Sequence, residues 1–453
     1  MDRLMVTVSG VRGTIGGTLT PEIACQFGLA FGASLGAGKT AVVGADTRPS
    51  GPMIRGAIIS GLLASRVNVV DVGVASTPAI ALMTRNLRAD GGVIITASHN
   101  PIEYNGIKFL QPAGMGLDAA AASALKALWE ASGWKLADSL GQGRLTWNDQ
   151  AAFAHVEAVC KAYDVATIAR KRFTVVVDSV NGAGCVETPM LLERLGCRLI
   201  HINSQPHGRF AHPPEPVEEN ITELLEAVRD NHADAGFAQD ADADRLAIVD
   251  ETGRFIGEEY TLALAAGYAL SRRKGPVATN MVTSRMIDDV AAAAGVRVVR
   301  APTGEANVIS ALLANQCVFA GEGGGGAIDP AVGLTRDSLV GIACLLGQLA
   351  ITDGSVSQLV DSIPRYTMRK TKMPCPLGAA EKVIALARTA FTARPGAQLN
   401  DSDGLRVDLG GAWVAVRASN TEPILRIIAE ASSPHAADAL VEEVTAMARK
   451  VIR

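Results

Sequence analysis

The stretch Ile-Thr-Ala-Ser-His-Asn-Pro-Ile-Glu-Tyr-Asn-Gly-Ile-Lys-Phe, residues 95–109, places a hydroxyl beside an imidazole at the end of an apolar run. A buried strand that ends in this way is a common means of presenting a nucleophile. The segment offers Ser98 as a nucleophile, His99 as a candidate proton carrier and Lys108 as a cation. The alternative is a surface turn in which Ser98 and Asn100 bond their own backbone.

Strands and helices are expected to alternate on both sides of this segment. One strand–loop–helix pattern occurs three times, as VVGADTRPSG at 42–51, VVVDSVNGAG at 175–184 and VATNMVTSRM at 277–286. Such an internal repeat predicts parallel-type α/β layering. The end of the chain differs, because strands at 405–409 and 413–416 flank a Gly-Gly turn and a helix follows. The expected domains are 1–150, 151–256 and 257–363, all α/β, and 364–453, of α+β type.

Composition excludes several classes of protein. The chain has 453 residues, with 42 Lys and Arg against 46 Asp and Glu, which gives a net charge of −4. This balance argues against a general binder of nucleic acid or of anionic membranes. No apolar run approaches the ~20 residues that span a bilayer, and Met1-Asp2-Arg3 opens no signal peptide. The seven Cys show no metal-ligand spacing, which predicts reduced thiols and a cytoplasmic location.

Three carboxylates alternate with alanines in Asp240-Ala241-Asp242-Ala243-Asp244. In an extended or gently turning backbone, residues at i, i+2 and i+4 share one face, so we expect the carboxylates to converge. Without a cation they would repel one another, and at least one pKa would rise. An all-oxygen ligand set suits Mg²⁺. A Ca²⁺ loop is disfavoured because Arg245 stands where such a loop needs Gly, and an ion-free acidic turn is the alternative.

The apolar run that follows these carboxylates, at 246–249, is expected to form a hairpin with 254–256. A second polar cluster lies near the end of the chain, between two expected strands. It combines hydroxyls, turn amides and guanidiniums, which is one way to bind a phosphate monoester without reacting with it. The alternative is a polar β-turn with a stray Arg. The cluster consists of Arg417, Ser419, Asn420, Thr421 and Arg426.

The run Gly321–Gly326 contains one side chain able to form hydrogen bonds, that of Glu322. Its glycines either allow a ligand to approach the backbone closely or make the loop flexible, and the sequence favours neither. The histidines outside the serine loop, including His155, have no partner evident from the sequence and receive no role.

Taken together, these stretches resemble the α-D-phosphohexomutase family. TASHNP at 96–101 is similar to its phosphoserine loop, and DADADR at 240–245 is similar to its metal loop, which usually has Gly where this chain has Ala. GEGGGG at 321–326 stands in the place of its sugar loop, and RASNTEP at 417–423 in that of its phosphate loop. Four motifs in the right order are highly specific. The family implies three similar α/β domains and a C-terminal α+β domain around one central cleft.

The resemblance implies that phosphorylated Ser98 gives its phosphoryl group to a sugar monophosphate, through a hexose 1,6-bisphosphate intermediate. A Lys transfers a proton only if its pKa is lowered, and the Arg12 cation is expected to lower that of Lys108. The implied ligands of Mg²⁺ are Ser98, Asp240, Asp242 and Asp244, and the implied catalytic residues are Ser98, His99, Lys108 and Arg12. The implied substrate-binding residues are Arg245, Thr303, Gly304, Glu322, Gly324, Arg417, Ser419, Asn420, Thr421 and Arg426.

One departure affects the expected substrate. Many sugar loops of the family end in Ser-x-His, whereas this chain has Gly324 and Gly326 at those positions. The Gly-rich form looks most like the archaeal-type branch usually called phosphoglucosamine mutase. We therefore expect glucosamine phosphate as substrate, with phosphomannomutase or phosphoglucomutase activity as the alternative. A metal-dependent sugar phosphatase and a non-catalytic sugar-phosphate sensor are rivals from other classes. The expected partners are small sugar phosphates, without nucleic acid or membrane, and the oligomeric state is open.

Overall fold

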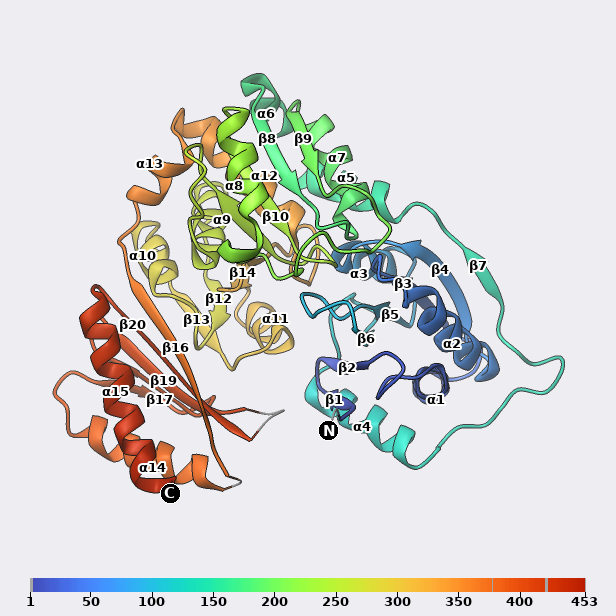
Figure 1. Cartoon of the computed structure of the whole chain (residues 1–453). Helices are drawn as coiled ribbons and strands as arrows, with labels where there is room; N and C mark the ends of the chain where they lie inside the picture. Colours follow the sequence, from blue (N-terminus) through green and yellow to red (C-terminus); the bar gives the residue numbers. More distant parts are fainter. Residues whose placement is uncertain (1–2, 377, 420–422, 453) are drawn as a thin grey trace.

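Four β-sheets follow one another along the chain (Figure 1). The computed structural model describes residues 3–376, 378–419 and 423–452. Each of the first three sheets combines parallel with antiparallel strand pairs, and the fourth is antiparallel throughout its described strands. The predicted fold class, three similar α/β units with mixed sheets and a C-terminal α+β unit, is confirmed.

The first sheet has the strand order β1-β2-β6-β5-β3-β4-β7. Strands β4, β3 and β5 are parallel, and β6 runs antiparallel beside β5. Helix α1 begins as its sequence predicts, because the Thr20 hydroxyl accepts the Ile23 N–H and Pro21 stands in the first turn. The strands are β1 Met5–Thr7, β2 Gly10–Thr14, β3 Thr40–Ala45, β4 Asn68–Val74, β5 Gly91–Ile95, β6 Tyr104–Leu110 and β7 Leu145–Trp147, and the helices α1 Pro21–Leu35, α2 Gly51–Ala64, α3 Thr77–Asn86 and α4 Ala119–Glu130.

The second and third sheets repeat the order β6-β5-β3-β4 of the first. Read from the antiparallel edge strand, the second is β11-β10-β8-β9 and the third is β15-β14-β12-β13. The three predicted strand–loop–helix openings become β3–α2, β8–α7 and β12–α10. The second unit comprises α5 Ala151–Ala162, α6 Val165–Lys171, β8 Thr174–Asp178, α7 Gly184–Arg194, β9 Arg198–Ile202, α8 Thr222–Asp230, β10 Ala235–Gln239 and β11 Leu246–Val249. The third comprises α9 Glu258–Arg272, β12 Val277–Asn280, α10 Met286–Ala293, β13 Val298–Ala301, α11 Glu305–Ala314, β14 Phe319–Glu322, β15 Gly326–Ile328, α12 Ser338–Thr352 and α13 Val356–Asp361.

The repeat places three polar loops at equivalent positions in the three units. In each unit one loop connects a parallel strand to the antiparallel strand beside it: 96–103 between β5 and β6, 240–245 between β10 and β11, and 323–325 between β14 and β15. These loops leave the carboxyl ends of the parallel strands, where open α/β sheets bind ligands. The serine loop, the carboxylate loop and the Gly-rich loop are therefore one element used three times.

The expected hairpin of 246–249 with 254–256 forms in part. The antiparallel bridge Val249↔Phe255 joins the two predicted arms, and the Ile256 N–H donates to the Ile248 carbonyl at 3.2 Å. The Asp250 carboxylate accepts the backbone N–H groups of Thr252 and Arg254 and so closes the turn between them. The longer pairing of β11 is with β10, in the register Gly236↔Val249 to Gln239↔Leu246, which the hairpin prediction did not include.

The C-terminal sheet has the order β16-β20-β19-β18-β17, and the predicted hairpin across the Gly-Gly turn is its β18–β19 pair. Helices α14 and α15 cover it, at the lower left of Figure 1. Its elements are β16 Thr367–Pro374, α14 Ala379–Thr392, β17 Gln398–Asn400, β18 Leu405–Asp408, β19 Trp413–Ala418, β20 Ile424–Ala431 and α15 Pro434–Val451.

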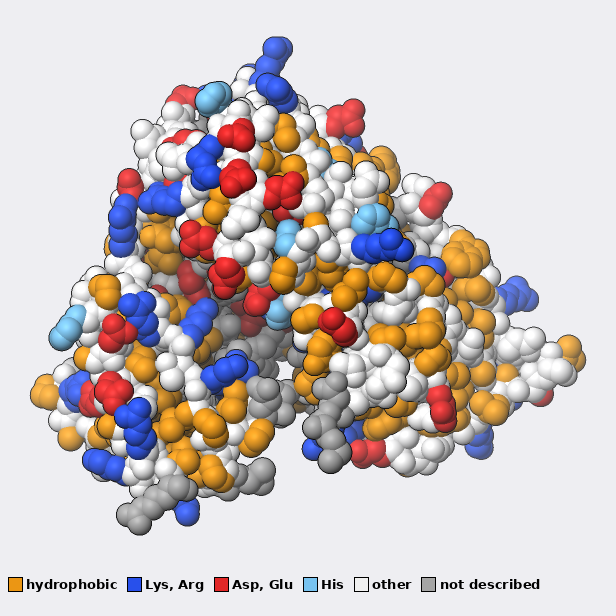
Figure 2. Space-filling model, viewed as in Figure 1, with side chains coloured by type: hydrophobic (Ala, Val, Ile, Leu, Met, Phe, Trp, Pro, Cys, Tyr) orange, Lys and Arg blue, Asp and Glu red, His pale blue; other side chains and the backbone are white. Residues whose placement is uncertain are grey.

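The largest hydrophobic core joins the second and third units, with α9 and α12 buried between them. The first unit and the C-terminal unit have cores of their own. Figure 2 shows the surface hollowed between the C-terminal unit and the first unit. Among the described residues, no helix has the length and apolar character needed to cross a membrane. The seven cysteines, all in the described part, are unpaired as predicted.

Candidate active site

Ser98 follows β5 in a loop that a buried guanidinium fixes in place. The Arg48 Nη2 donates to the carbonyl oxygens of Ser98 and Asn100 at 2.7 and 2.6 Å, and its Nη1 donates to those of Pro101 and Tyr104 at 2.8 and 3.0 Å. Ser98 has φ +50°, a left-handed conformation that a non-Gly residue keeps only where its surroundings impose it. Arg48 is the group that imposes it.

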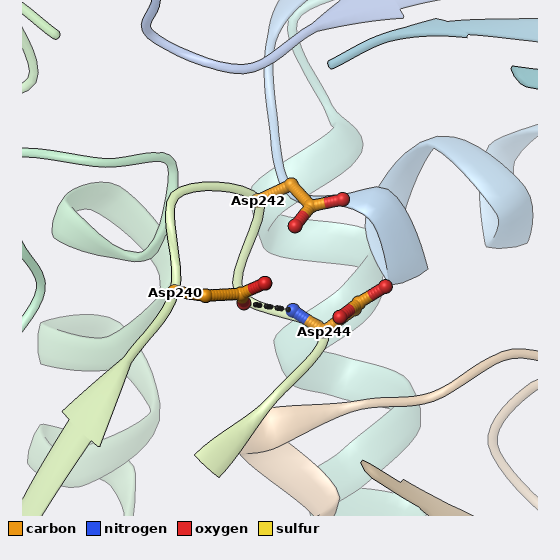
Figure 3. A group of neighbouring side chains, drawn as sticks. All are labelled: Asp240, Asp242 and Asp244. Atoms are coloured by element: carbon orange, nitrogen blue, oxygen red, sulfur yellow. Dashed lines mark hydrogen bonds between the residues drawn. The ribbon is translucent and has the colours of Figure 1, made fainter. Parts of the chain in front are cut away.

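The carboxylate loop is a tight turn, sharper than the extended or gently turning backbone that was expected (Figure 3). Ala243 has φ +55°, and the N–H groups of Asp244 and Arg245 both donate to the Asp240 Oδ1 at 3.1 Å. The backbone therefore curls around the Asp240 carboxylate. The three carboxylates still converge as predicted, through the turn and not through strand alternation.

The three carboxylates form a site that fits a divalent metal ion. One oxygen of each lies within 4.8 Å of the others, and all three side chains are buried. The Oδ1 atoms of Asp242 and Asp244 are buried without a hydrogen-bond partner among the described residues. Burial, together with the charges of Asp242 and Asp244, raises the pKa of Asp240 well above its ordinary value. A hard divalent ion satisfies the free oxygens and removes this repulsion.

Ser98 and His99 lie against this site. The Ser98 hydroxyl donates to the Asp240 Oδ2 at 2.6 Å, and its Oγ is 3.3 Å from the His99 Nδ1. Burial and the neighbouring Arg245 and Arg12 cations lower the pKa of His99 to about 3. The imidazole is therefore neutral at neutral pH and a weak base.

Lys108 projects from β6 onto the same carboxylates. Its Nζ donates to the Asp242 Oδ2 at 2.8 Å and to the Asp244 Oδ2 at 3.4 Å. Burial lowers the pKa of Lys108, but the attraction of Asp242 and Asp244 outweighs burial and raises it overall. The expected lowering by Arg12 is therefore wrong for this arrangement. The Arg12 Nη1 donates instead to the Asn100 Oδ1 at 2.7 Å, so that it braces the serine loop.

The predicted sugar-loop residues form a second group. The Glu322 Oε1 accepts the Asn280 Nδ2 at 2.9 Å and the Gly304 N–H at 3.3 Å. Thr303, through its N–H and its hydroxyl, donates to the Asp403 Oδ2 of the C-terminal unit. A Cβ at Gly324 would be in contact with the Arg245 guanidinium, so the Gly-rich loop and Arg245 are neighbours.

The Gly-rich loop is closely packed, which contradicts its interpretation as a flexible segment. Gly325 has φ +80°, its carbonyl accepts the Leu246 N–H at 3.0 Å, and a Cβ there would overlap the Leu246 carbonyl. A Cβ at Gly326 would overlap the stem of Arg336. Arg336 thus fills the space that a side chain at position 326 would need. Its guanidinium donates to Asp244 Oδ2 at 2.7 Å, Glu305 Oε2 at 2.7 Å and Glu322 Oε2 at 3.5 Å.

The predicted phosphate loop lies in the β19–β20 hairpin. Arg417 is directly opposite Arg426 across this pair, and Arg426 is opposite Lys372 of β16. Residues opposite each other share a face of the sheet, so three cations stand in one row, a concentration of positive charge that suits an anionic ligand. Ser419 also lies at this end of β19, while the predicted Asn420 and Thr421 lie outside the described residues.

Comparison with known proteins agrees with this architecture. Four models of phosphoglucomutase/phosphomannomutase match: α/β/α domain I over residues 3–135, domain II over 154–253, domain III over 258–366 and the C-terminal domain over 375–447. The chain belongs to the α-D-phosphohexomutase family. It is therefore a phosphohexomutase, an isomerase of carbohydrate metabolism in a family that binds sugar phosphates.

Relatives of this phosphohexomutase divide between two names. A phosphoglucomutase/phosphomannomutase of Thermococcus kodakarensis is 40% identical over 96% of both chains. A probable phosphoglucosamine mutase of the same organism is 38% identical over 98% of both. The crystal structure of a phosphoglucomutase/phosphomannomutase family protein from Burkholderia thailandensis has a TM-score of 0.85 and 26% identity, over 99% of both chains.

Three residues that adjoin the predicted site residues were not predicted from the sequence. Arg48 stood in one of the repeated openings, but its contacts depend on how the serine loop folds back over it. Arg336 lies in a loop without a motif, and only the absence of side chains at 324 and 326 hinted that another residue fills that space. Lys372 lies on a strand whose register with β20 the sequence does not specify.

Proposed function

We propose that the chain is a phosphoglucosamine mutase, which interconverts glucosamine 6-phosphate and glucosamine 1-phosphate through phosphorylated Ser98 and glucosamine 1,6-bisphosphate. The observation that carries the choice of sugar is the Glu322 carboxylate, which Asn280 and the Gly304 N–H orient in a loop without any other side chain able to bind. A carboxylate forms a charge-assisted hydrogen bond with the protonated 2-amino group of glucosamine. Relatives named probable phosphoglucosamine mutase support the same choice.

The reaction begins with the phosphoryl group on the Ser98 Oγ. The bond from phosphorus to Oγ breaks, a bond from phosphorus to the free sugar hydroxyl forms, and the hydroxyl proton passes to a group in the site. The bisphosphate then turns over and returns its other phosphoryl group to Ser98. Lys108 is the proposed proton carrier, and neutral His99 and the Arg12 cation orient the groups around Ser98.

Asp240, Asp242 and Asp244, with the phosphate on Ser98, are the proposed ligands of Mg²⁺. When bound, the ion neutralises charge that develops on phosphorus and weakens the attraction that raises the pKa of Lys108. Arg245, beside the Gly-rich loop, is placed to bind the phosphate that is being transferred.

The other phosphate of the substrate is proposed to bind the cationic row of Arg417 and Arg426, with Ser419 and the predicted Asn420 and Thr421. Lys372 extends this row by one strand. Asp403, which binds Thr303, is also among the charges that act on Arg417, so the phosphate loop and the sugar side of the site meet there. The unpaired cysteines support a cytoplasmic location.

The test is a side-by-side measurement of kcat/KM for the 1-phosphates of glucosamine, glucose and mannose. Glucosamine 1-phosphate is expected to be the best substrate, with measurable turnover of the others, because Gly324 and Gly326 present nothing that rejects them. In Glu322→Gln the preference for glucosamine over glucose is expected to fall about tenfold, since a charged hydrogen bond becomes a neutral one. A preference that survives in Glu322→Gln would overturn the role of Glu322.

The second candidate is a phosphoglucomutase/phosphomannomutase, which the name of the relative at 40% identity favours. A glucose or mannose phosphate that exceeds the glucosamine ester by about tenfold, or 1.4 kcal/mol, would select it. The two remoter functions are tested in the same assay. Release of inorganic phosphate without isomer would indicate a phosphatase, and binding without turnover would indicate a sensor.

A further inference from the structure

His155, in helix α5, lies outside the site described above and is completely buried between two carboxylates. Its Nδ1 is 2.7 Å from the Glu187 Oε2, and its Nε2 is 2.7 Å from the Asp337 Oδ2. Glu187 belongs to α7 of the second unit, and Asp337 precedes α12 of the third. Burial alone would lower the pKa of His155, but Asp337 and Glu187 raise it to about 10. A cation therefore joins two buried anions from different units.

The Glu187 carboxylate reaches the carboxylate loop through Ser76 and Thr77 of the first unit. It accepts the Ser76 N–H at 3.0 Å and the Ser76 hydroxyl at 2.7 Å. The next residue, Thr77, donates its N–H to the Asp242 carbonyl at 2.9 Å and its hydroxyl to the Asp242 Oδ2 at 2.6 Å. Any movement of Glu187 is thereby passed to both the backbone and the side chain of Asp242.

The Asp337 carboxylate reaches the same loop from the opposite side. Its Oδ1 accepts the Leu339 N–H at 2.9 Å, which fixes the start of α12. The next residue, Ser338, donates its N–H to the Ala243 carbonyl at 3.2 Å and its hydroxyl at 2.7 Å. Ala243 has φ +55°, so this contact bears on the one strained residue of the turn. Two dipeptides, Ser76-Thr77 and Asp337-Ser338, thus hold the loop by hydrogen bonds from both sides, an arrangement called the clasp below. His155 links them, since it contacts Asp337 directly and Ser76 through Glu187.

Removal of His155 would leave two buried carboxylates without a counter-charge. A buried ion pair that loses one partner is strongly unfavourable, so the carboxylates would separate or take up protons. Either change alters the hydrogen bonds of Ser76 and of the α12 terminus, and through them the positions of Asp242 and Ala243.

We propose that His155 is a positioning residue of the metal site: with Glu187 and Asp337 it sets the geometry of the loop Asp240–Asp244 from the first and third units at once. The proposal rests on the proposed binding of a divalent cation by these carboxylates, and does not depend on which sugar is preferred. Groups that orient metal ligands typically change metal affinity about 10- to 100-fold when they are altered.

The test compares Mn²⁺ binding, measured by titration calorimetry of the full chain, in the parent and in His155→Gln. Mn²⁺ affinity is expected to fall about tenfold or more. The KM for sugar phosphate at saturating metal is expected to stay unchanged, since the hydrogen bonds of His155 go to Glu187 and Asp337, neither of which belongs to the cationic row. The matched control is Tyr163→Phe, which removes a buried hydrogen bond from the end of α5 to Asp329 of the third unit, without a path to the carboxylate loop. It should leave Mn²⁺ affinity unchanged.

Ser76→Ala removes the hydroxyl that binds Glu187, and Ser338→Ala removes the hydroxyl that binds the Ala243 carbonyl. These two variants test the proposal if His155→Gln does not fold. Weaker Mn²⁺ binding in both supports the proposal. Unchanged affinity in His155→Gln or in both Ser variants, or an equal loss in Tyr163→Phe, overturns it. A parent that binds Mn²⁺ but prefers another sugar contradicts the proposed substrate alone. A parent that isomerises sugar phosphates without binding Mn²⁺ overturns the metal site and, with it, the role of His155.

Discussion

At Ser98 the backbone and the side chain are fixed by different neighbours. Arg48 binds the carbonyl groups around Ser98, whereas the hydroxyl itself contacts Asp240 and His99. The hydroxyl therefore takes no part in the contacts by which Arg48 fixes the loop. This separation of tasks suits a residue whose oxygen must carry and release a group while its backbone stays still.

We predict that Ser98→Ala abolishes isomerisation and leaves the fold intact, because the substitution removes the phosphate carrier and none of the contacts of Arg48. Ala accepts the φ of +50° as Ser does, so no new strain arises. Turnover and intact mass, read for one added phosphate on the parent alone, check this. Equal turnover in the two proteins would exclude Ser98 as the carrier.

Arg336 and Gly326 compete for one space, which a double-mutant cycle can show. Arg336→Ala removes the partner of Asp244, Glu305 and Glu322, and should lower kcat/KM about 10- to 150-fold, as expected for lost charge-assisted bonds of 1.5–3 kcal/mol. Gly326→Ala should also lower activity, because its Cβ displaces the Arg336 stem. In the Arg336→Ala background the same Gly326→Ala change should be nearly neutral. Additive losses would show that the two residues act separately.

At the scale of elements, the sequence predicted the strand–loop–helix repeat. It did not predict that the three polar loops would stand at the same place in each unit, between a parallel strand and the antiparallel strand beside it. The three openings at 42–51, 175–184 and 277–286 share a strand–loop–helix pattern in the sequence, and all three form strand–loop–helix units. The polar loops lie at a different joint, before the antiparallel strand. Strand β11 lies between two neighbouring segments, and the sequence does not show that its longer pairing is with β10 and that only a short bridge joins it to 254–256.

The serine loop is expected to lose its fixed conformation when Arg48 is replaced. We predict that Arg48→Lys destabilises the first unit by about 3–5 kcal/mol, because an ammonium cannot bind four carbonyl groups and Asp46 in one plane. An earlier urea-induced unfolding step of the first unit, with loss of phosphate incorporation at Ser98, is the expected result. A variant with the stability and turnover of the parent would show that Arg48 does not fix the loop.

Substitutions in the cationic row of Arg417, Arg426 and Lys372 are expected to change the KM for sugar phosphates more than kcat. Arg417→Ala is expected to raise the KM for sugar monophosphates about 10- to 150-fold, the effect of losing one charge-assisted phosphate contact. Lys372→Ala should have a smaller effect, because this side chain is exposed to solvent at the outer end of the row. Initial rates over a range of substrate concentrations separate the two parameters. An unchanged KM in Arg417→Ala would place the phosphate elsewhere.

At the scale of the whole molecule, the order of the four motifs was enough to predict the four-unit architecture. It was not enough to predict how the units join. The largest core is shared by the second and third units, and His155 was given no role because Glu187 and Asp337 are 32 and 182 residues away from it. Contacts of that range follow from the packing of α5 against α3, α7 and α12, which no local pattern encodes.

The same cluster makes the stability of the molecule depend on pH. Glu187 and Asp337 are the titratable groups that contact His155, from α7 and from the start of α12, and Ser76 at the start of α3 adds its N–H and its hydroxyl, neither of which titrates, to this cluster. The pKa of His155 is raised from 6.5 to about 10 on folding. A raised pKa stabilises the folded protein fully below the unfolded value and loses this effect as pH rises through the folded one. The contribution is therefore present below pH 6.5 and lost towards pH 10.

We therefore predict that the Tm of the parent falls between pH 7 and pH 10 and that the fall is clearly smaller in His155→Gln, which lacks the titrating ring. Tyr163→Phe keeps the cluster and should retain the slope of the parent over most of this range, because a tyrosine begins to ionise only near the upper end of it. The measurement is thermal unfolding at fixed ionic strength across this range, without metal. Identical slopes in the parent and His155→Gln would mean that the ring is not charged in the folded protein, and the clasp on the carboxylate loop would then depend on neutral hydrogen bonds alone.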